Sequence, residues 1–330
     1  MHASGKIAVK VILVLGLLAF AGLYFASVAL KHGLQPDARE RVILTRSLSP
    51  FDHRRAMRDL ETMLAFGPRP SNSDANASVR RWLSSQLRAA GFPVREHAFE
   101  ADTPQGHISM TNLIAASRGG RPGATAIITH YDTMPVTDFV FIGANASGAG
   151  AVWLLEMARA IGPECKGRSL WYIWCDGHEW PDGKGRDGLY GSRALVADLE
   201  ARGELGQLAA AIAVSRIGDY YLGIAQDPAA PAWLRELVWD VARDQGHGQH
   251  FRAAAYAFRD DHIPFRDAGI PCLALIDFSF GGSRLEHDRY WRTAGDTQDR
   301  VCGESLQAVA DVLYHALPSI DGRPEAGPEG

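Results

Sequence analysis

The stretch that most constrains this chain runs from Ser169 to Arg193 and reads SLWYIWCDGHEWPDGKGRDGLYGSR. It begins with an apolar and aromatic run, Leu170 to Cys175, whose length and residue types predict a strand buried on both faces. The run stops at Asp176-Gly177-His178-Glu179, which sets three ionisable side chains at the carboxyl end of the strand, where ligands bind in open α/β sheets. A solvated turn explains one acid after a strand, but it explains an acid–His–Glu cluster followed by Trp180 less well. The stretch therefore predicts a functional site.

Strand-like and helix-like segments alternate along most of the chain. Strands are predicted at 94–98, 108–115, 124–129, 170–175, 210–214 and 271–276. Helices are predicted at 51–64, 75–90, 147–161, from about 189, and at 233–244, 261–268 and 304–317. This alternation predicts an α/β fold, a three-layer α/β/α sandwich with a mixed, mostly parallel central sheet.

The amino terminus differs in composition from the rest of the chain. Residues 11–30 carry no charge, and they are numerous enough to span a bilayer as a helix. A cleaved signal peptide usually has a shorter apolar core, of about 7–15 residues, although Ser27-Val28-Ala29 leaves cleavage open. We therefore expect an uncleaved single-pass membrane anchor, and the positive charges of Lys6 and Lys10 favour an extracytoplasmic carboxyl-terminal domain.

The changes in composition along the sequence also predict how the chain is divided into segments. We expect a transmembrane anchor at 1–32, a linker at 33–50, a single large domain at 51–318 and a disordered Gly/Pro/Glu-rich tail at 319–330.

A net charge of −4, without a basic patch interleaved with aromatic residues, argues against nucleic acid as a partner. The four cysteines form no CxxC pair, which argues against a thiolate metal site.

Polar groups follow other predicted strands as well. His130 and Asp132 stand two residues apart just past a strand end, where a metal ligand and its orienting carboxylate would be found. Asp260-Asp261-His262 precedes a predicted helix, and Trp291-Arg292 lies in a polar loop before the last helix. An H-x-D pair is weak evidence alone, so the argument depends on all of these segments together.

In this order the segments resemble the zinc aminopeptidase superfamily, which also contains the glutaminyl-peptide cyclotransferases (glutaminyl cyclases). The matching phrases are THYD at 129–132, GANASG at 143–148, DGHE at 176–179, DGLYGSR at 187–193 and DDHIPF at 260–265. The resemblance covers about 51–318 and implies a zinc-exopeptidase-like fold. DGHEW, LYGSR, DDHIPF and Trp291 are more similar to the cyclase branch than to the peptidase branch.

The resemblance also implies roles for individual residues. Members of the superfamily hold one or two zinc ions at strand ends and use a glutamate beside a ligand glutamate as proton shuttle. By position, His130 and Glu179 match metal ligands. The candidate catalytic residues are His178, Asp132 and Asp261, and the candidate substrate-pocket residues are Trp180, Trp291, Arg292, Asp260 and His262.

Several expected ligands are replaced in this chain. The bridging aspartate position is Ala144, the aspartate before Ile-Gly is replaced around Ser215-Arg216, the loop histidine is Arg292, and the general-base glutamate is His178. A catalytic zinc needs three protein ligands and a water, whereas only Glu179 remains at the cyclase-type site and only His130 at the second. Arg292 is a permanent cation, so we expect it to turn inward and pair with Glu179 in place of the metal.

These observations support two hypotheses. In the first, the metal site is degenerate, no cofactor binds, and the protein binds a peptide or protein N-terminus without catalysis. In the second, the protein is an active metallo-aminopeptidase or glutaminyl-peptide cyclotransferase with one zinc ion. That ion would be held by His178 with His130, Glu179, Asp261 and His287.

The apolar segment 11–30 generates the first testable prediction. Because it is long and uncharged, the protein should stay in the membrane pellet during detergent-free extraction. Immunoblotting of pellet and supernatant, with amino-terminal sequencing of the purified protein, measures this. A soluble mature form that begins near Leu30 would show a cleaved signal peptide instead.

Overall fold

The computed structural model describes residues 48–257, 259–281 and 289–321. The predicted anchor at 11–30, nearly all of the linker and the tail after residue 321 lie outside the described residues. Within the described ranges, no helix combines the length and the apolar character needed to cross a bilayer. The predicted domain at 51–318 is the part in which the fold and the site are found.

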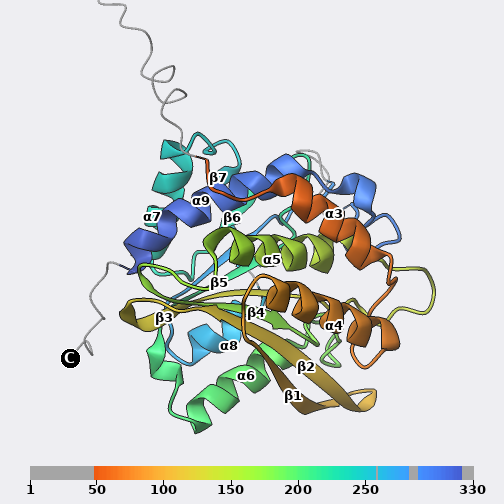
Figure 1. Cartoon of the computed structure of the whole chain (residues 1–330). Helices are drawn as coiled ribbons and strands as arrows, with labels where there is room; N and C mark the ends of the chain where they lie inside the picture. The colour runs from red at the N-terminus through yellow and green to blue at the C-terminus, as the bar shows by residue number, and fades with distance from the viewer. Residues whose placement is uncertain (1–47, 258, 282–288, 322–330) are drawn as a thin grey trace, which may run out of the picture. The chain divides into compact units, whose positions relative to one another are not determined.

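The centre of the domain is a six-stranded sheet with the order β1-β2-β4-β3-β5-β8 (Figure 1). Its strands are β1 (Val94–Thr103), β2 (Gly106–Ser117), β3 (Arg121–His130), β4 (Arg168–Cys175), β5 (Leu208–Ser215) and β8 (Cys272–Ile276). β1 and β2 form an antiparallel hairpin, and β2 is also antiparallel to β4, whereas β4, β3, β5 and β8 are parallel. The predicted mixed, mostly parallel sheet is confirmed.

Helices cover both faces of this sheet (Figure 1). One face carries α3 (His53–Leu64), α4 (Asp74–Ala89), α5 (Gly150–Ile161), α7 (Ala232–Asp244) and α9 (Gly303–Asp321). The other carries α6 (Tyr190–Ala201) and α8 (His262–Asp267). The predicted three-layer arrangement is therefore confirmed as well.

Several short elements were not predicted. They are the π-helical turn η1 (Ala144–Ala149), the 3₁₀ turns η2 (Leu205–Gln207) and η3 (Gln298–Arg300), and a two-stranded parallel sheet of β6 (Ile224–Gln226) and β7 (Phe251–Ala255). They lie in the connections between the main strands and helices. Of these, η1 bears directly on the site.

Strand β4 shows why the apolar run at 170–175 organises the chain. Leu170, Tyr172 and Trp174 lie in the core beneath α3, α4 and α5, whereas Ile173 and Cys175 lie in the core beneath α6 and α8. Successive side chains of a strand point to opposite faces, so a strand between two helical layers must be apolar at every position. The run is buried on both faces, as predicted.

A buried carboxylate in α9 fastens the chain before α3 to the rest of the domain. Asp311 Oδ1 accepts hydrogen bonds from the Ser49 backbone N–H at 2.9 Å and from the Ser49 hydroxyl at 2.6 Å. Oδ2 lies 3.1 Å from Nε2 of His247, which follows α7. Burial alone raises the pKa of Asp311, but the hydrogen bonds from His247, Ser49 and Gln307 outweigh it and lower the pKa to about 2.

This network predicts a pH-dependent contribution to stability. Because the folded-state pKa lies below the unfolded value near 3.9, the contribution is present above about pH 4 and is lost as the pH falls through 2. Asp311→Asn should lower the free energy of unfolding by about 2 kcal/mol at pH 7 and by much less near pH 2. Urea denaturation at both pH values measures it, with Asp240→Asn at an exposed acid as control. An equal loss at both pH values would contradict the prediction.

Candidate functional site

The site lies where three parallel strands end. β4, β3 and β5 are neighbours in the sheet, so their carboxyl ends meet at one edge. His130 is the last residue of β3, Ser215 is the last residue of β5, and His178 and Glu179 follow β4. The structure thus brings together His130, Asp132, His178, Glu179 and Asp261, as predicted, although the chemical role of each stays a prediction.

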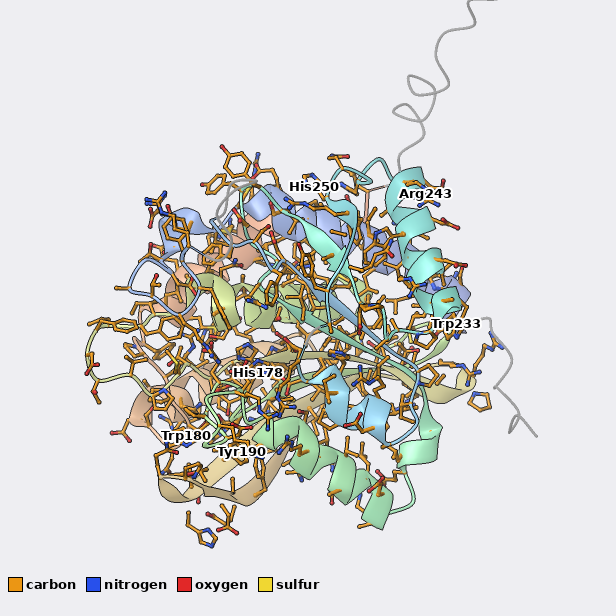
Figure 2. The ribbon with its side chains drawn as sticks, turned by 180° about the vertical axis from the view of Figure 1, so that it is seen from behind. His178, Trp180, Tyr190, Trp233, Arg243 and His250 are labelled. Atoms are coloured by element: carbon orange, nitrogen blue, oxygen red, sulfur yellow. The ribbon has the colours of Figure 1, made fainter. Side chains whose placement is uncertain are left out.

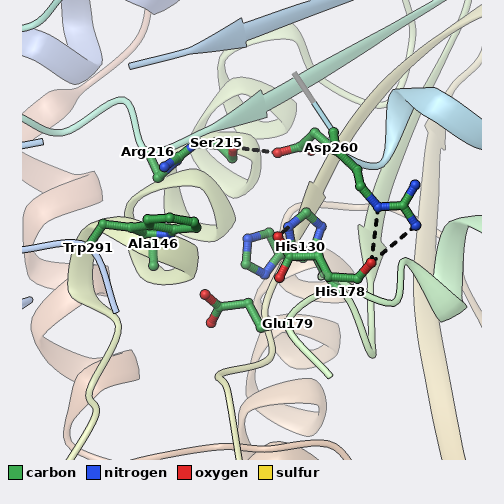
Figure 3. A pocket seen from close by; sticks show the side chains of 10 residues that line it. His130, Ala146, His178, Glu179, Ser215, Arg216, Asp260 and Trp291 are labelled. Carbon is green, nitrogen blue, oxygen red and sulfur yellow. Dashed lines mark hydrogen bonds and ion pairs between the residues drawn. The ribbon is translucent and has the colours of Figure 1, made fainter. Parts of the chain in front are cut away.

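A small pocket opens at this edge (Figure 3). Its lining consists of His130, Ala146, His178, Glu179, Asp187, Ser215, Arg216, Arg259, Asp260 and Trp291. The free space inside is about 20 Å³, which is enough for roughly one water molecule. The pocket is therefore narrow, and most of its lining residues are polar.

Two histidines form the floor of the pocket. The rings of His130 and His178 are stacked in parallel, with their centroids 3.8 Å apart. His130 Nδ1 lies 3.3 Å from Asp132 Oδ1, and the other Asp132 oxygen accepts the Glu179 backbone N–H at 2.9 Å. Burial alone raises the pKa of Asp132, but the two imidazoles outweigh it and lower the pKa below its ordinary value. Asp132 thus orients His130 and fixes the backbone beside Glu179.

His178 is held by a carboxylate on its other side. His178 Nδ1 lies 2.8 Å from Asp261 Oδ2, and Asp261 Oδ1 accepts the Ser192 hydroxyl at 2.6 Å. Burial opposes a charge on the ring, but Asp261 and Asp260 outweigh it and raise the pKa of His178 to about 9. The two carboxylates therefore favour the protonated form of the His178 ring.

Glu179 and Asp260 are the two acids at the pocket wall. Glu179 Oε2 accepts the Met134 backbone N–H at 3.1 Å, and burial raises the pKa of its carboxyl above the ordinary value. Asp260 Oδ2 accepts the Ser215 hydroxyl at 2.9 Å, and Oδ1 accepts the Asp261 N–H at 2.7 Å. Ser215, where the resemblance leads one to expect an aspartate, thus donates to Asp260.

The turn at Ala144 contributes backbone to the site and no ligand. Ala144 is fully buried at the start of η1. Asp296 accepts the N–H groups of Asn145 at 2.7 Å and Ala146 at 3.0 Å, and burial raises its pKa to about 6. Arg69 donates to the carbonyl of Gly143 at 3.2 Å from the other side. The turn is therefore held by protein groups alone.

Arg292 does not make the predicted contact with Glu179. Its guanidinium forms an ion pair with Asp187 Oδ1 and lies 4.5 Å from the centre of the Trp291 ring. The φ angle of Arg292 is 56°, a left-handed conformation that is uncommon for residues other than glycine. The interpretation of Arg292 as a substitute for the metal beside Glu179 was wrong, and Arg292 does not line the pocket.

A second arginine, Arg216, lies in the pocket instead. Its guanidinium carbon is 4.8 Å from the centre of the Trp291 ring and 4.9 Å from that of Phe278. The sequence reasoning noted the missing aspartate around Ser215-Arg216 but assigned Arg216 no role. Its position directly after β5 was the signal that could have identified it. Asp187 and Arg259 also line the pocket, and the sequence reasoning assigned neither of them a role.

Two other predicted pocket residues point elsewhere. Trp180 packs with Ala101 and Met110 of the β1–β2 hairpin, near Tyr190 (Figure 2), and its indole N–H donates to Gln105 at 2.9 Å. His262 is fully buried, and its Nε2 lies 3.3 Å from Asp227 Oδ2. Neither lines the pocket, so the sequence-based assignment of both to a substrate pocket was wrong.

The residues present do not fit the zinc site that the resemblance implies. Position 144 supplies a methyl group, Arg292 binds Asp187, and Glu179 is alone of the three cyclase-type ligands. Within the described residues, the best alternative donor set is His178, Asp260 and Asp261, whose potential ligand atoms lie within 4.8 Å of one another. Both carboxylates of that set already accept hydrogen bonds from Ser192 and Ser215, and the cation of Arg216 lines the same pocket.

A three-layer fold with such a polar edge is shared by zinc exopeptidases and glutaminyl cyclases. The sequence model for peptidase family M28 matches residues 112–317. The chain therefore belongs to peptidase family M28.

Named relatives agree with this assignment. The chain is 29% identical over 312 residues to a glutaminyl-peptide cyclotransferase-like protein of Bos taurus, covering 85% of this chain and 78% of the relative. The crystal structure of an Acidobacteriales bacterium glutaminyl cyclase is similar with a TM-score of 0.77 and 31% identity, over 85% of this chain and 98% of that one. A Zn-dependent exopeptidase from Parabacteroides distasonis shares the fold with a TM-score of 0.72, at 23% identity over 84% of this chain and 100% of that one.

The observed ion pair between Arg292 and Asp187 can be tested by its contribution to the stability of the fold. Arg292 and Asp187 are both mostly shielded from solvent, so Arg292→Ala and Asp187→Ala should each lower the free energy of unfolding by about 1–3 kcal/mol. The double variant should lose less than the sum, because the second removal no longer leaves a charge without its partner. Arg292→Ala with Asp240→Ala, at an exposed acid on α7, is the matched control and should be additive. Urea denaturation measures all variants, and non-additivity in the control pair alone would contradict the structure.

Proposed function

We propose that this protein is a peptide-binding member of peptidase family M28 that does not perform zinc-dependent chemistry. The observation that carries the proposal is the composition of the pocket. It keeps the carboxylate of Glu179, but the η1 turn lines it with the methyl group of Ala146, position 144 of that turn is also alanine, and the arginine at position 292 is paired with Asp187. One remaining ligand cannot hold a catalytic zinc, which needs three.

A peptide amino terminus is the ligand whose chemistry suits the remaining acid. Glu179 is buried, and a buried carboxylate is costly unless a cation or hydrogen bonds compensate it. Met134 supplies one backbone hydrogen bond at 3.1 Å, and the nearby groups of His130 and Arg292 do not outweigh the burial that raises the pKa of Glu179. The α-ammonium group of a peptide offers a positive charge and three N–H donors, which is the role a metal would otherwise fill.

We further propose that the domain is held at a membrane. The support is the uncharged segment 11–30 with basic residues before it, which favours a single-pass anchor and an extracytoplasmic domain. A protein so placed would meet the amino termini of secreted or surface peptides and proteins. Nucleic acid is not proposed as a partner, because the net charge is −4.

Binding of peptide amino termini is tested with acetylation as the chemical control. Isothermal titration of the purified full chain should detect a peptide with a free amino terminus and not its N-acetylated form. Glu179→Gln should weaken binding of the free peptide by about tenfold or more, since a charge-assisted bond is lost. Asp240→Asn, at an exposed acid on α7, is the control and should bind normally. Equal binding of free and acetylated peptides would contradict the proposal.

An active enzyme with a rebuilt single-metal site is the second candidate, favoured by the cluster of His178, Asp260 and Asp261. It requires about one zinc per chain in the wild type and loss of that zinc in His178→Ala. The first candidate instead expects negligible zinc in both proteins after equilibration with zinc and desalting. Metal analysis by mass spectrometry separates the two. Assays of aminopeptidase and glutaminyl cyclisation activity then test for catalysis without metal.

A further inference from the structure

A larger hollow lies at the opposite edge of the sheet from the pocket described above. It opens beside the amino ends of β3 and β4 and next to the carboxyl end of α9 (Figure 1), and its free space is about 580 Å³. Sites for small molecules commonly have volumes of about 300–1,000 Å³ and an apolar wall with a few polar groups. The lining of this hollow and the lining of the pocket share no residue among those that the structure describes.

Apolar side chains form most of the wall of this hollow. They come from three elements that meet here: Ile161 at the end of α5, Leu170 in β4, and Tyr314 and Leu317 in α9. Leu170 and Leu317 are only 3% and 5% exposed, so the wall is part of the packed domain. A wall of this kind favours an apolar ligand, because removing CH₂ groups from water stabilises the bound state.

Positive charge stands at the rim of the hollow. Arg121 is the first residue of β3, Lys166 lies in the loop before β4, and both side chains are exposed. Within the described part of the chain, neither of them forms an ion pair. Of the acids in the lining, Asp321 is buried and accepts hydrogen bonds from other groups of the fold, and Glu164 is exposed. The exposed cations therefore outnumber the exposed acid, and the rim complements an anion.

We propose that this hollow binds a fatty acid, with the hydrocarbon chain against the apolar wall and the carboxylate at Arg121 and Lys166. This site is separate from the pocket of the proposed function and goes beyond it. A carboxylate forms charge-assisted hydrogen bonds with a guanidinium and an ammonium group, whereas an alcohol of the same length brings no charge. A neighbouring hollow of about 790 Å³ is also lined by Ile161 and Glu164, so the space continues and suits a long chain.

A native cysteine of the hollow can report whether the hollow is occupied. Cys165 lines it and is partly exposed, whereas Cys302, also partly exposed, precedes α9 outside it. Dodecanoate at about ten times its Kd should slow the alkylation of Cys165 by N-ethylmaleimide about tenfold, because the bound chain covers the thiol. Alkylation of Cys302 should keep its rate. Mass spectrometry of the purified full chain follows both thiols.

The chemistry of the ligand is tested by varying its chain and its head. Affinity should rise about fourfold for each CH₂ group added between octanoate and dodecanoate, as the burial of apolar surface requires. Dodecanol should bind about tenfold more weakly than dodecanoate, since the charge-assisted contact is lost. The double variant Arg121→Met with Lys166→Met should remove this difference. Arg243→Met, at an exposed arginine on α7, is the matched control and should retain it.

A second measurement does not depend on the reactivity of a thiol. A fatty acid that carries a diazirine in its chain should cross-link to residues 161–170 and 314–321 on illumination. Cross-links confined to other segments, equal protection of Cys165 and Cys302, or equal affinity for dodecanoate and dodecanol would each overturn the inference. Each of these results would leave the proposed binding at Glu179 standing. Circular dichroism and thermal unfolding confirm that each variant is folded.

Discussion

Compensation of buried negative charge is the constraint on which the site depends. The carboxylates crowded at the carboxyl edge of the sheet are all buried: Asp132, Asp176, Glu179, Asp260, Asp261 and Asp296. Each therefore needs a nearby cation or hydrogen-bond donors, or its pKa rises until it is protonated. Asp261 obtains both from His178 and Ser192, whereas Asp176 relies on neutral donors, and burial raises its pKa to about 6. The chain itself supplies the compensation that a metal would share in.

The same compensation of charge explains how this edge of the sheet keeps its fold although several of the expected metal ligands are replaced. The turn at Ala144 is fixed by hydrogen bonds to Asp296 and by Arg69, and the loop carrying Arg292 is fixed by the ion pair with Asp187. None of these contacts needs a metal ion. The positions of the strand ends are set by the apolar core on both faces of β4, which is remote from the charges. The architecture of this edge therefore rests on the apolar core and on these polar contacts.

The sheet and most of the helices were predictable because burial determines where apolar residues must occur along each of these elements. A strand buried on both faces, such as β4, must be apolar throughout, and the sequence shows it. β6 and β7 have only three and five residues, too few to show a period. The convergence of His130, His178 and Asp261 followed from the strand ends, but the partner of Arg292 did not. The long side chain of an arginine can reach several acids, and the sequence does not show which of them it meets.

Arg216 brings positive charge to the pocket but none of the reactivity of a metal ion. A bound zinc has an open position for water and lowers the pKa of that water, whereas a guanidinium has fixed donors and no position to open. A guanidinium is a permanent cation with donors only, so it cannot accept a proton from a reacting group. The groups around it point the same way, because Asp261 and Asp260 raise the pKa of His178 to about 9 and hold it protonated. The proposed binding function relies on these charged groups of the pocket and not on a metal ion.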